Sequence, residues 1–425
     1  MIETTNFGAF VLNSVGSFTR QSNGSSGSEL VELMISIGKA KTNGNEINIQ
    51  TIKFPCAEAG LPDSCENIDS IPSPHLLQPF YEALSLLQQP LEQLLVKQHP
   101  NCIVADFFFP WATDSAAKFG IPRLVFHGTG FFSLCVNMCV GFYEPYNHVS
   151  SDSELFVIPN LPGEIKMTMM QLPPFMMSKE KTGMAKLLEE ANESELRSYG
   201  VVVNSFYELE KVYADHFRKV LGRKAWHIGP LYLCNKDIIT DLPDSQLRDI
   251  AMGLEASGQQ FIWVVRRSGK DGEEWLPDGF EKSMEGKGLI IRGWTPQVLI
   301  LEHEAIGAFV THCGWNSTLE AVTAGVPMVT WPIAAEQFFK EKLVTEVLRI
   351  GVPVGAKKWV RLKGDSITCD AVEKAVKRIM NGKEPIEMRN RTKVLSQLAN
   401  HAMEEGGSSY TDLNALIQGL SSLSH

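Results

Sequence analysis

The sequence predicts an α/β protein built from two units that each contain a parallel sheet. Its 425 residues are enough for two domains with separate hydrophobic cores. Short apolar runs alternate with stretches of helical periodicity along most of the chain, and this order produces parallel sheets. Residues 305–331 follow the order strand, polar turn, helix, strand, so polar side chains come where both strands end. Ligands bind beyond the carboxyl ends of strands in such sheets.

The first unit is expected to span residues 1–237. Its first 34 residues show little pattern and include a loop-like run rich in Gly and Ser. Apolar runs closed by turn residues predict strands, and apolar residues at helical spacing predict a helix. The expected strands are 103–109, 121–126 and 200–204, and the helix is 84–97.

The second unit is expected to span residues 242–407, and residues 408–425 are expected to pack back toward the first unit. Apolar residues at helical spacing from Leu247 to Leu254 predict a helix that stops at Gly258. Further strands are expected at 261–265 and 288–291, and a helix at 372–379. The last helix opens at Ser408-Ser409, where Asp412 is expected to contribute to a capping arrangement.

Composition excludes several classes of function. The net charge of −10 argues against nucleic acid or anionic membrane as a partner, because both require a basic face. No apolar stretch approaches the roughly 20 residues that span a bilayer, and the start of the chain lacks the layout of a signal peptide. Eight scattered cysteines suit free thiols, and Cys135 and Cys139 are expected to be buried rather than to bind metal. These features favour a cytoplasmic monomer without a metal.

The polar turn before the predicted helix at 319–324 indicates an anion site. Asn316 and Ser317 stand at the start of that helix, where free backbone N–H groups and the helix dipole bind phosphate. His312, at the tip of the preceding strand, offers a further donor to the same anion. The alternative is that Asn316 or Ser317 simply caps the helix.

Other side chains near the same strand ends suit the remaining parts of a nucleotide sugar. Glu320, on the first turn of the helix, suits a ribose diol, as acidic residues do in dinucleotide folds. Trp294 offers a flat face for a base, although a lone tryptophan more often belongs to the core. Glu336 and Gln337 follow the second strand in a loop, where they can bond to sugar hydroxyls.

The 44 residues 294–337, which contain the run HCGWNS and end in Gln337, resemble the donor-binding box of plant UDP-sugar-dependent glycosyltransferases of secondary metabolism (family 1, GT-B fold). The similarity extends over residues 35–237 and 242–425. It implies two Rossmann-like domains facing across a cleft. It also implies inverting transfer of a hexose from a UDP-sugar, used as co-substrate with no cofactor. The acceptor would be a hydroxyl of a small lipophilic plant metabolite, either a terpenoid, a flavonoid or another phenolic.

The resemblance assigns roles to the residues of the box. A terminal glutamine such as Gln337 favours UDP-glucose, whereas histidine there favours UDP-galactose. The implied donor-binding residues are Trp294 on uracil, Thr295 and Gln297 by the nucleoside, His312, Asn316 and Ser317 on the diphosphate, Glu320 on the ribose, and Trp315, Glu336 and Gln337 on the sugar.

The catalytic residues that the resemblance implies are incomplete in this chain. The family uses a histidine as base and an aspartate that orients it. Asp106 matches the aspartate, but the first histidine of the chain is His75, and residues 1–34 do not resemble the opening strand and histidine-bearing loop of the family. His127, which follows a predicted strand, is the candidate on the acceptor side. An unshifted carboxylate is a poor base for a hydroxyl, so Asp106 does not replace the histidine on its own.

A second segment is expected to be missing between the two units. The resemblance implies a strand and a Gly-Ser turn before the helix at 247–254, but residues 234–237 run almost directly into residues 241–243. That strand would lie in the middle of the second sheet, so its neighbours must close up or the fold is weakened. Three hypotheses follow: a working glycosyltransferase, a non-catalytic relative that binds a nucleotide sugar or small molecule, or a truncated product without function.

Overall fold

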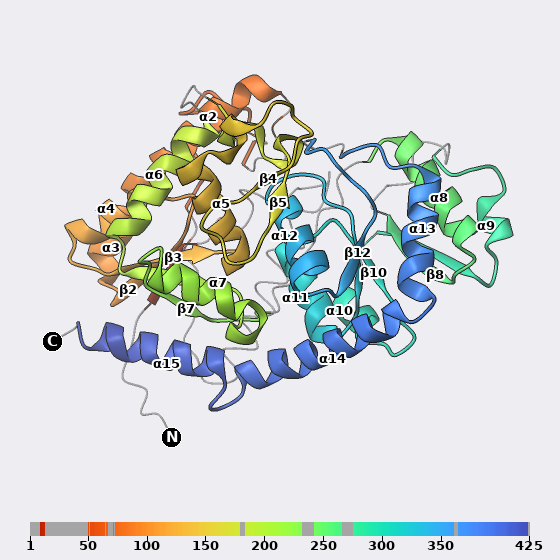
Figure 1. Cartoon of the computed structure of the whole chain (residues 1–425). Helices are drawn as coiled ribbons and strands as arrows, with labels where there is room; N and C mark the ends of the chain where they lie inside the picture. Colours follow the sequence, from red (N-terminus) through yellow and green to blue (C-terminus); the bar gives the residue numbers. More distant parts are fainter. Residues whose placement is uncertain are drawn as a thin grey trace.

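The computed structural model consists of two α/β halves joined along one edge by the last two helices (Figure 1). It describes residues 9–12, 50, 52–63, 65–66, 71, 73–178, 183–231, 242–265, 275–293, 295–360 and 364–423.

A five-stranded parallel sheet forms the centre of the N-terminal half. Its order is β1-β2-β3-β6-β7, with Ala9 opposite Cys102 and Leu124 opposite Gly200. The elements of this half are β1 (Ala9–Leu12), η2 (Pro74–Leu76), α2 (Leu77–Leu86), α3 (Gln88–Gln98), β2 (Cys102–Asp106), α4 (Trp111–Lys118), β3 (Arg123–His127), α5 (Phe131–Tyr143), η3 (Pro145–His148), β4 (Phe156–Val157), β5 (Lys166–Met167), η4 (Met169–Gln171), η5 (Pro174–Met176), α6 (Met184–Arg197), β6 (Gly200–Val203), α7 (Tyr207–Lys219) and β7 (Ala225–His227).

The three strands predicted in this half are all present, and two expectations need correction. The helix expected at 84–97 is two helices, α2 and α3, because the chain turns at Leu87. The structure also has the edge strand β1 within residues 1–34, where the sequence was expected to lack the opening strand of the family. The loop that would carry the catalytic histidine lies outside the described residues.

The C-terminal half continues the alternation of helix and strand. Its elements are α8 (Asp244–Ser257), β8 (Phe261–Val265), α9 (Phe280–Ser283), β9 (Gly288–Arg292), α10 (Gln297–Leu301), β10 (Phe309–Thr311), α11 (Trp315–Ala324), β11 (Met328–Thr330), α12 (Gln337–Lys342), a π-helical turn η6 (Leu343–Val347), β12 (Gly351–Pro353), α13 (Cys369–Met380), α14 (Glu384–Met403) and α15 (Ser408–Ser421). Helix α8 ends as predicted at Gly258, whose φ of 69° is in the left-handed region that favours glycine.

The strands of this half form two separate parallel sheets among the described residues, one of order β10-β11-β12 and one containing β8 and β9. Parallel sheets are normally covered on both faces. Here Ile262 and its register partner Leu289 are 43% and 54% exposed, and Val310 of β10 is 45% exposed. Among the described residues the two sheets are therefore separate, and each has apolar side chains that are partly exposed. That a central strand is missing stays a prediction, because residues 232–241 lie outside the described residues.

Helices α14 and α15 connect the two halves. They run as one band beneath the molecule, and α15 lies under β7 and α7 of the N-terminal half (Figure 1). The expectation that Asp412 caps α15 is wrong, because its carboxylate reaches the N-terminal half instead. It accepts hydrogen bonds from Arg218 Nη2 at 2.6 Å and from the backbone N–H of His227 at 2.9 Å. Asp412 therefore fastens the last helix to β7 and α7.

Cys135 and Cys139 are buried free thiols on α5, as predicted. The described part of the chain contains no group of three His, Cys, Asp or Glu side chains placed to hold a metal ion. None of its helices is long and apolar enough to cross a membrane.

Candidate functional site

Two turns at the carboxyl ends of neighbouring strands form the candidate site. Strands β10 and β11 are parallel partners, with Thr311 opposite Thr330, so the residues after them come together at one edge. Each turn contains a non-glycine residue in the left-handed region, Cys313 with φ of 65° and Ala335 with φ of 51°. Such conformations cost free energy and persist only where the surrounding structure holds them in place. They are concentrated at ligand sites.

Helix α11 starts at Trp315, four residues earlier than the apolar pattern indicated, so Asn316 and Ser317 lie in its first turn. No side chain caps this end of the helix. The alternative prediction, that Asn316 or Ser317 acts as the cap, is therefore wrong. The Oδ1 atom of Asn316 is buried and has no hydrogen-bond partner within the described structure. A buried carbonyl without a partner costs free energy, so this position is suited to a ligand.

The residues predicted to bind the nucleoside and the ribose lie together. Gln297 Nε2, at the start of α10, donates to Glu320 Oε2 at 2.7 Å and to Ser317 Oγ at 3.3 Å. Glu320 is 5% exposed, and its carboxylate faces the segment that follows β9. Thr295 lies beside them, where its carbonyl accepts from the N–H of Gln297. Trp294 lies outside the described residues.

The second turn supplies Glu336 and Gln337 at the start of α12. The amide oxygen of Gln337 accepts from the N–H groups of Ile333 and Ala334 at 2.8 and 2.9 Å, which fixes the turn. Glu336 forms an ion pair with Lys340, one helical turn later. Burial opposes ionisation of Glu336, but the ammonium of Lys340 outweighs it and lowers the pKa of the carboxyl, with a smaller contribution from His312. The two turns thus lie close enough for their charges to interact.

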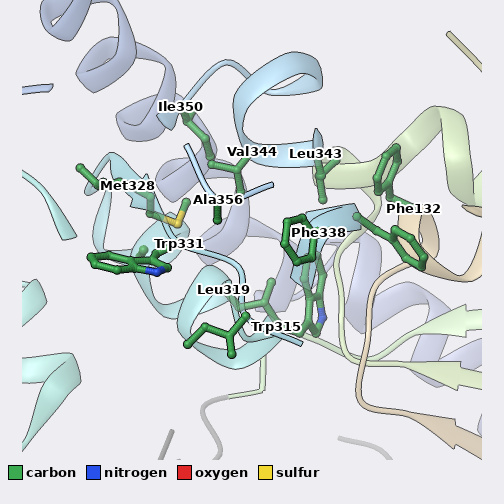
Figure 2. Packing of buried hydrophobic residues seen from close by; sticks show 14 of the residues in the cluster. Phe132, Trp315, Leu319, Met328, Trp331, Phe338, Leu343, Val344, Ile350 and Ala356 are labelled. Atoms are coloured by element: carbon green, nitrogen blue, oxygen red, sulfur yellow. The ribbon is translucent and has the colours of Figure 1, made fainter. Parts of the chain in front are cut away.

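The indole of Trp315 contacts the N-terminal half instead of standing open at the site. It is 3% exposed, and its Nε1 donates to the carbonyl of Asn204 at 2.6 Å. Figure 2 shows Trp315 and Phe338 packed within a cluster that also contains Phe132 of α5. Any contact between Trp315 and a sugar must therefore involve its backbone, because its side chain joins the two halves.

Gly130, the residue before α5, allows a close contact between the halves. An added Cβ atom would lie 2.5 Å from both Glu210 Oε2 and Trp315 Cζ2. The buried Glu210 carboxylate accepts from the N–H groups of Phe131 and Phe132 at 3.1 and 2.8 Å. Burial raises the pKa of Glu210, whereas these hydrogen bonds and the charge of Lys340 oppose that rise.

Asp106 lies at the carboxyl end of β2, as predicted. Its Oδ1 accepts from the N–H of Phe108 at 3.0 Å, and its backbone carbonyl accepts from buried Arg123 at 2.9 Å. Burial raises the pKa of Asp106, and the Phe108 N–H and the nearby charges of His127 and Arg123 partly oppose this. A carboxylate with a raised pKa is a stronger base than an exposed one.

His127 is paired inside the N-terminal half. Its Nε2 lies 2.7 Å from Glu195 Oε2 of α6, and its ring packs against Phe107 with 4.7 Å between centroids. The residue is 5% exposed. This arrangement explains His127 as part of the packing between β3 and α6, and gives no support to the prediction that it faces an acceptor.

Sequence reasoning missed the residues that join this site to the N-terminal half, namely Lys340, Glu210, Asn204 and Gly130. The spacing of four residues between Glu336 and Lys340 is a readable signal for an ion pair on a helix. No comparable signal exists for the bonds from Phe131 and Phe132 to Glu210, because these partners are almost 80 residues away in the sequence.

Comparisons with known proteins show the family to which the chain belongs. The family described as "UDP-glucoronosyl and UDP-glucosyl transferase" matches residues 229–398. Scopoletin glucosyltransferase from Nicotiana tabacum is 51% identical over 424 residues, which cover 91% of this chain and 89% of that protein. UDP-glucose flavonoid 3-O-glucosyltransferase 7 from Fragaria ananassa is 54% identical over 427 residues, covering 90% of this chain and 87% of that protein.

Solved structures extend the similarity to the fold. The structure of Glycyrrhiza uralensis UGT73P12 complexed with glycyrrhetinic acid 3-O-monoglucuronide superposes with a TM-score of 0.82 at 37% identity, covering 92% of this chain and 88% of that one. The fold is that of a glycosyltransferase of the GT-B class. The chain belongs to the family of plant UDP-glycosyltransferases, whose co-substrate is a UDP-sugar.

Proposed function

We propose that this chain binds UDP-glucose at the two strand-end turns and transfers glucose to a phenolic hydroxyl of a small lipophilic plant metabolite. The observation that carries the proposal is the buried, unpartnered Oδ1 of Asn316 at the start of α11. Rotation of the Asn316 amide by 180° exchanges Oδ1 and Nδ2, and in that orientation its N–H group donates to the diphosphate. The N-terminus of this ten-residue helix favours the negative diphosphate.

The positions of the side chains support the donor roles that we propose. His312, Asn316 and Ser317 bind the diphosphate, and Glu320, fixed by Gln297, accepts from the ribose hydroxyls. Glu336 and Gln337 bind the glucose hydroxyls from the second turn. Trp294 and Thr295 are assigned to the nucleoside by resemblance alone.

The acceptor class follows from the proton that must leave the attacking hydroxyl. No histidine precedes His75, so Asp106, which would orient the base in the family, lacks its partner there. A phenol, with an ordinary pKa of about 10, loses its proton far more readily than an aliphatic alcohol. A buried carboxylate whose pKa is raised, such as Asp106, is therefore better matched to phenols. Phenolic acceptors also agree with the names of the Nicotiana and Fragaria relatives.

The test combines binding with turnover on the purified full chain. UDP and UDP-glucose are titrated by calorimetry, and UDP-glucose is then incubated with a coumarin, a flavonol and a triterpenoid alcohol. We expect binding of both nucleotides and glucoside formation from the two phenols in preference to the alcohol. Glu320→Gln should weaken UDP binding about tenfold through loss of a charged hydrogen bond. Glu405→Gln, at an exposed position, is the matched control. Absence of UDP binding would refute the proposal.

A second function is favoured by the missing histidine. In this alternative the chain is a non-catalytic relative that binds UDP-glucose or a small molecule. The same experiment separates the two, because the binder takes up UDP-glucose but forms no glucoside with any acceptor. A truncated product without function would bind neither nucleotide.

We also propose that the chain is a cytoplasmic monomer. The support is the absence of paired cysteines among the described residues, since free thiols suit a reducing compartment. Size-exclusion chromatography with light scattering tests the oligomeric state, and a fluorescent fusion expressed in plant cells tests the location.

A further inference from the structure

Lys340 is a buried cation to which none of the roles above is assigned. It lies on α12, is 1% exposed, and its ammonium forms an ion pair with Glu336. Its Nζ is 5.7 Å from the centroid of the Trp315 ring. Lysine is almost never fully buried unless it is paired, so this side chain requires an explanation.

The charge of the ammonium acts on carboxylates of both halves. Glu336, whose side chain is 29% exposed, belongs to the same helix. Glu210 of the N-terminal half feels the charge of Lys340 and is fixed by three hydrogen bonds of its own, from Phe131 N, Phe132 N and Ser205 Oγ. Phe338 belongs to the same helix as Lys340, and Figure 2 shows it close to Trp315 in the apolar cluster. Salt screens such a buried cation much less than an exposed one.

We propose that Lys340 is a positioning residue, which holds the carboxylate of Glu336 in the orientation that receives the glucose hydroxyls. A free glutamate at the start of a helix samples several rotamers, and fixing it in advance lowers the cost of binding. The ion pair uses Oε1 of Glu336, and Oε2 is the oxygen that we assign to the sugar. The inference rests on the proposed function, because it needs UDP-glucose in this site.

The structure separates this effect from binding of the nucleotide itself. Asn316, Ser317 and Glu320, which are assigned to the diphosphate and the ribose, lie on α11. Gln297 of α10 donates to Ser317 and Glu320, and His312 lies in the turn before α11. Glu336 comes from the other turn, after β11. Loss of Lys340 should therefore weaken the binding of UDP-glucose, because its glucose reaches Glu336. The binding of UDP, which has no glucose, should be unchanged.

The experiment measures Kd for UDP and UDP-glucose by calorimetry on wild type, Lys340→Met, Glu336→Gln and the double variant. We expect Lys340→Met to raise the Kd of UDP-glucose about tenfold, equivalent to about 1.4 kcal/mol, and to change that of UDP by less than about twofold. In the Glu336→Gln background, Lys340→Met should have no further effect on the ratio of the two constants. Lys340→Gln, which keeps a hydrogen-bond donor, should fall between wild type and Lys340→Met, and stands in if Lys340→Met fails to fold.

Each contrary result has a distinct meaning. Equal weakening of UDP and UDP-glucose would assign Lys340 a purely structural role and overturn the inference. An unchanged Kd for UDP-glucose in both Lys340 variants would overturn it as well, with the proposed function intact. A wild-type chain that binds neither nucleotide would refute the proposed function and this inference together.

Discussion

Replacement of Gly130 by alanine tests how tightly the two halves fit together. The added Cβ would lie 2.5 Å from Glu210 Oε2 and from Trp315 Cζ2, well inside van der Waals contact. Neither neighbour can move freely, because Glu210 is held by three hydrogen bonds and Trp315 by its bond to Asn204. Alanine is compatible with the backbone of Gly130, which has φ of −87° and ψ of 168°, so the effect isolates the steric clash.

Overpacking of this kind costs about 1–3 kcal/mol, and disturbing charged hydrogen bonds to Glu210 costs about 1.5–3 kcal/mol more. We therefore expect Gly130→Ala to lower the free energy of unfolding by about 3 kcal/mol, measured by urea denaturation with circular dichroism. Gly141→Ala on α5 is the matched control. An added Cβ at Gly141 meets nothing within 4 Å, so alanine should stabilise the helix by about 0.5–1 kcal/mol. The reasoning fails if both variants have the same urea midpoint.

Three further changes test other parts of the structure. Trp315→Phe leaves the buried carbonyl of Asn204 without its donor and should cost about 1–3 kcal/mol in thermal or urea unfolding, whereas Trp359→Phe, which loses an exposed bond of 3.1 Å, should cost much less. Burial lowers the pKa of His227 below its ordinary 6.5, so the unfolded chain binds the proton first as the pH falls. The free energy of unfolding should therefore decrease as the pH drops below about 6.5. His227→Gln should flatten this part of the plot of stability against pH, and an unchanged plot would contradict the assignment. Insertion of a five-residue strand of Val and Ile with a Gly-Ser turn before residue 242 should join the two sheets. The melting temperature should then rise, and amide hydrogen exchange in β8 and β10 should slow. Unchanged exchange would show that the sheets are divided for another reason.

The elements that sequence predicted well are those whose cause is local. Strand β8 has the predicted bounds, Phe261–Val265, because five apolar residues stand between turn signals. Helix α8 ends at Gly258 because only a residue that tolerates positive φ closes a helix this way. The absence of a strand between residues 231 and 242 stays a prediction from the short chain length there, because those residues lie outside the described ones.

The features that sequence could not predict depend on partners far along the chain. Asp412 has the spacing of a capping residue, yet its carboxylate meets Arg218, 194 positions away. His127 was predicted to lie on the acceptor side, but its ring pairs with Glu195 of α6. Trp315 belongs to the most recognisable motif of the chain, but its indole serves the junction with Asn204. Short-range patterns identify which residues are unusual, whereas tertiary packing decides what each one does.

The divided sheet links the solubility of this protein to its donor. Within the described residues β10 has one strand partner, and it leads directly into His312 and the donor turn. An unpaired strand edge is a template for pairing with another chain, so partly unfolded copies of this protein are prone to associate through β10. A ligand that binds only the folded form opposes this association by mass action, and does so more strongly as its concentration rises above its Kd. We expect a UDP-sugar to stabilise the folded chain. The protein should then remain monomeric where the UDP-sugar is abundant and aggregate where it is scarce.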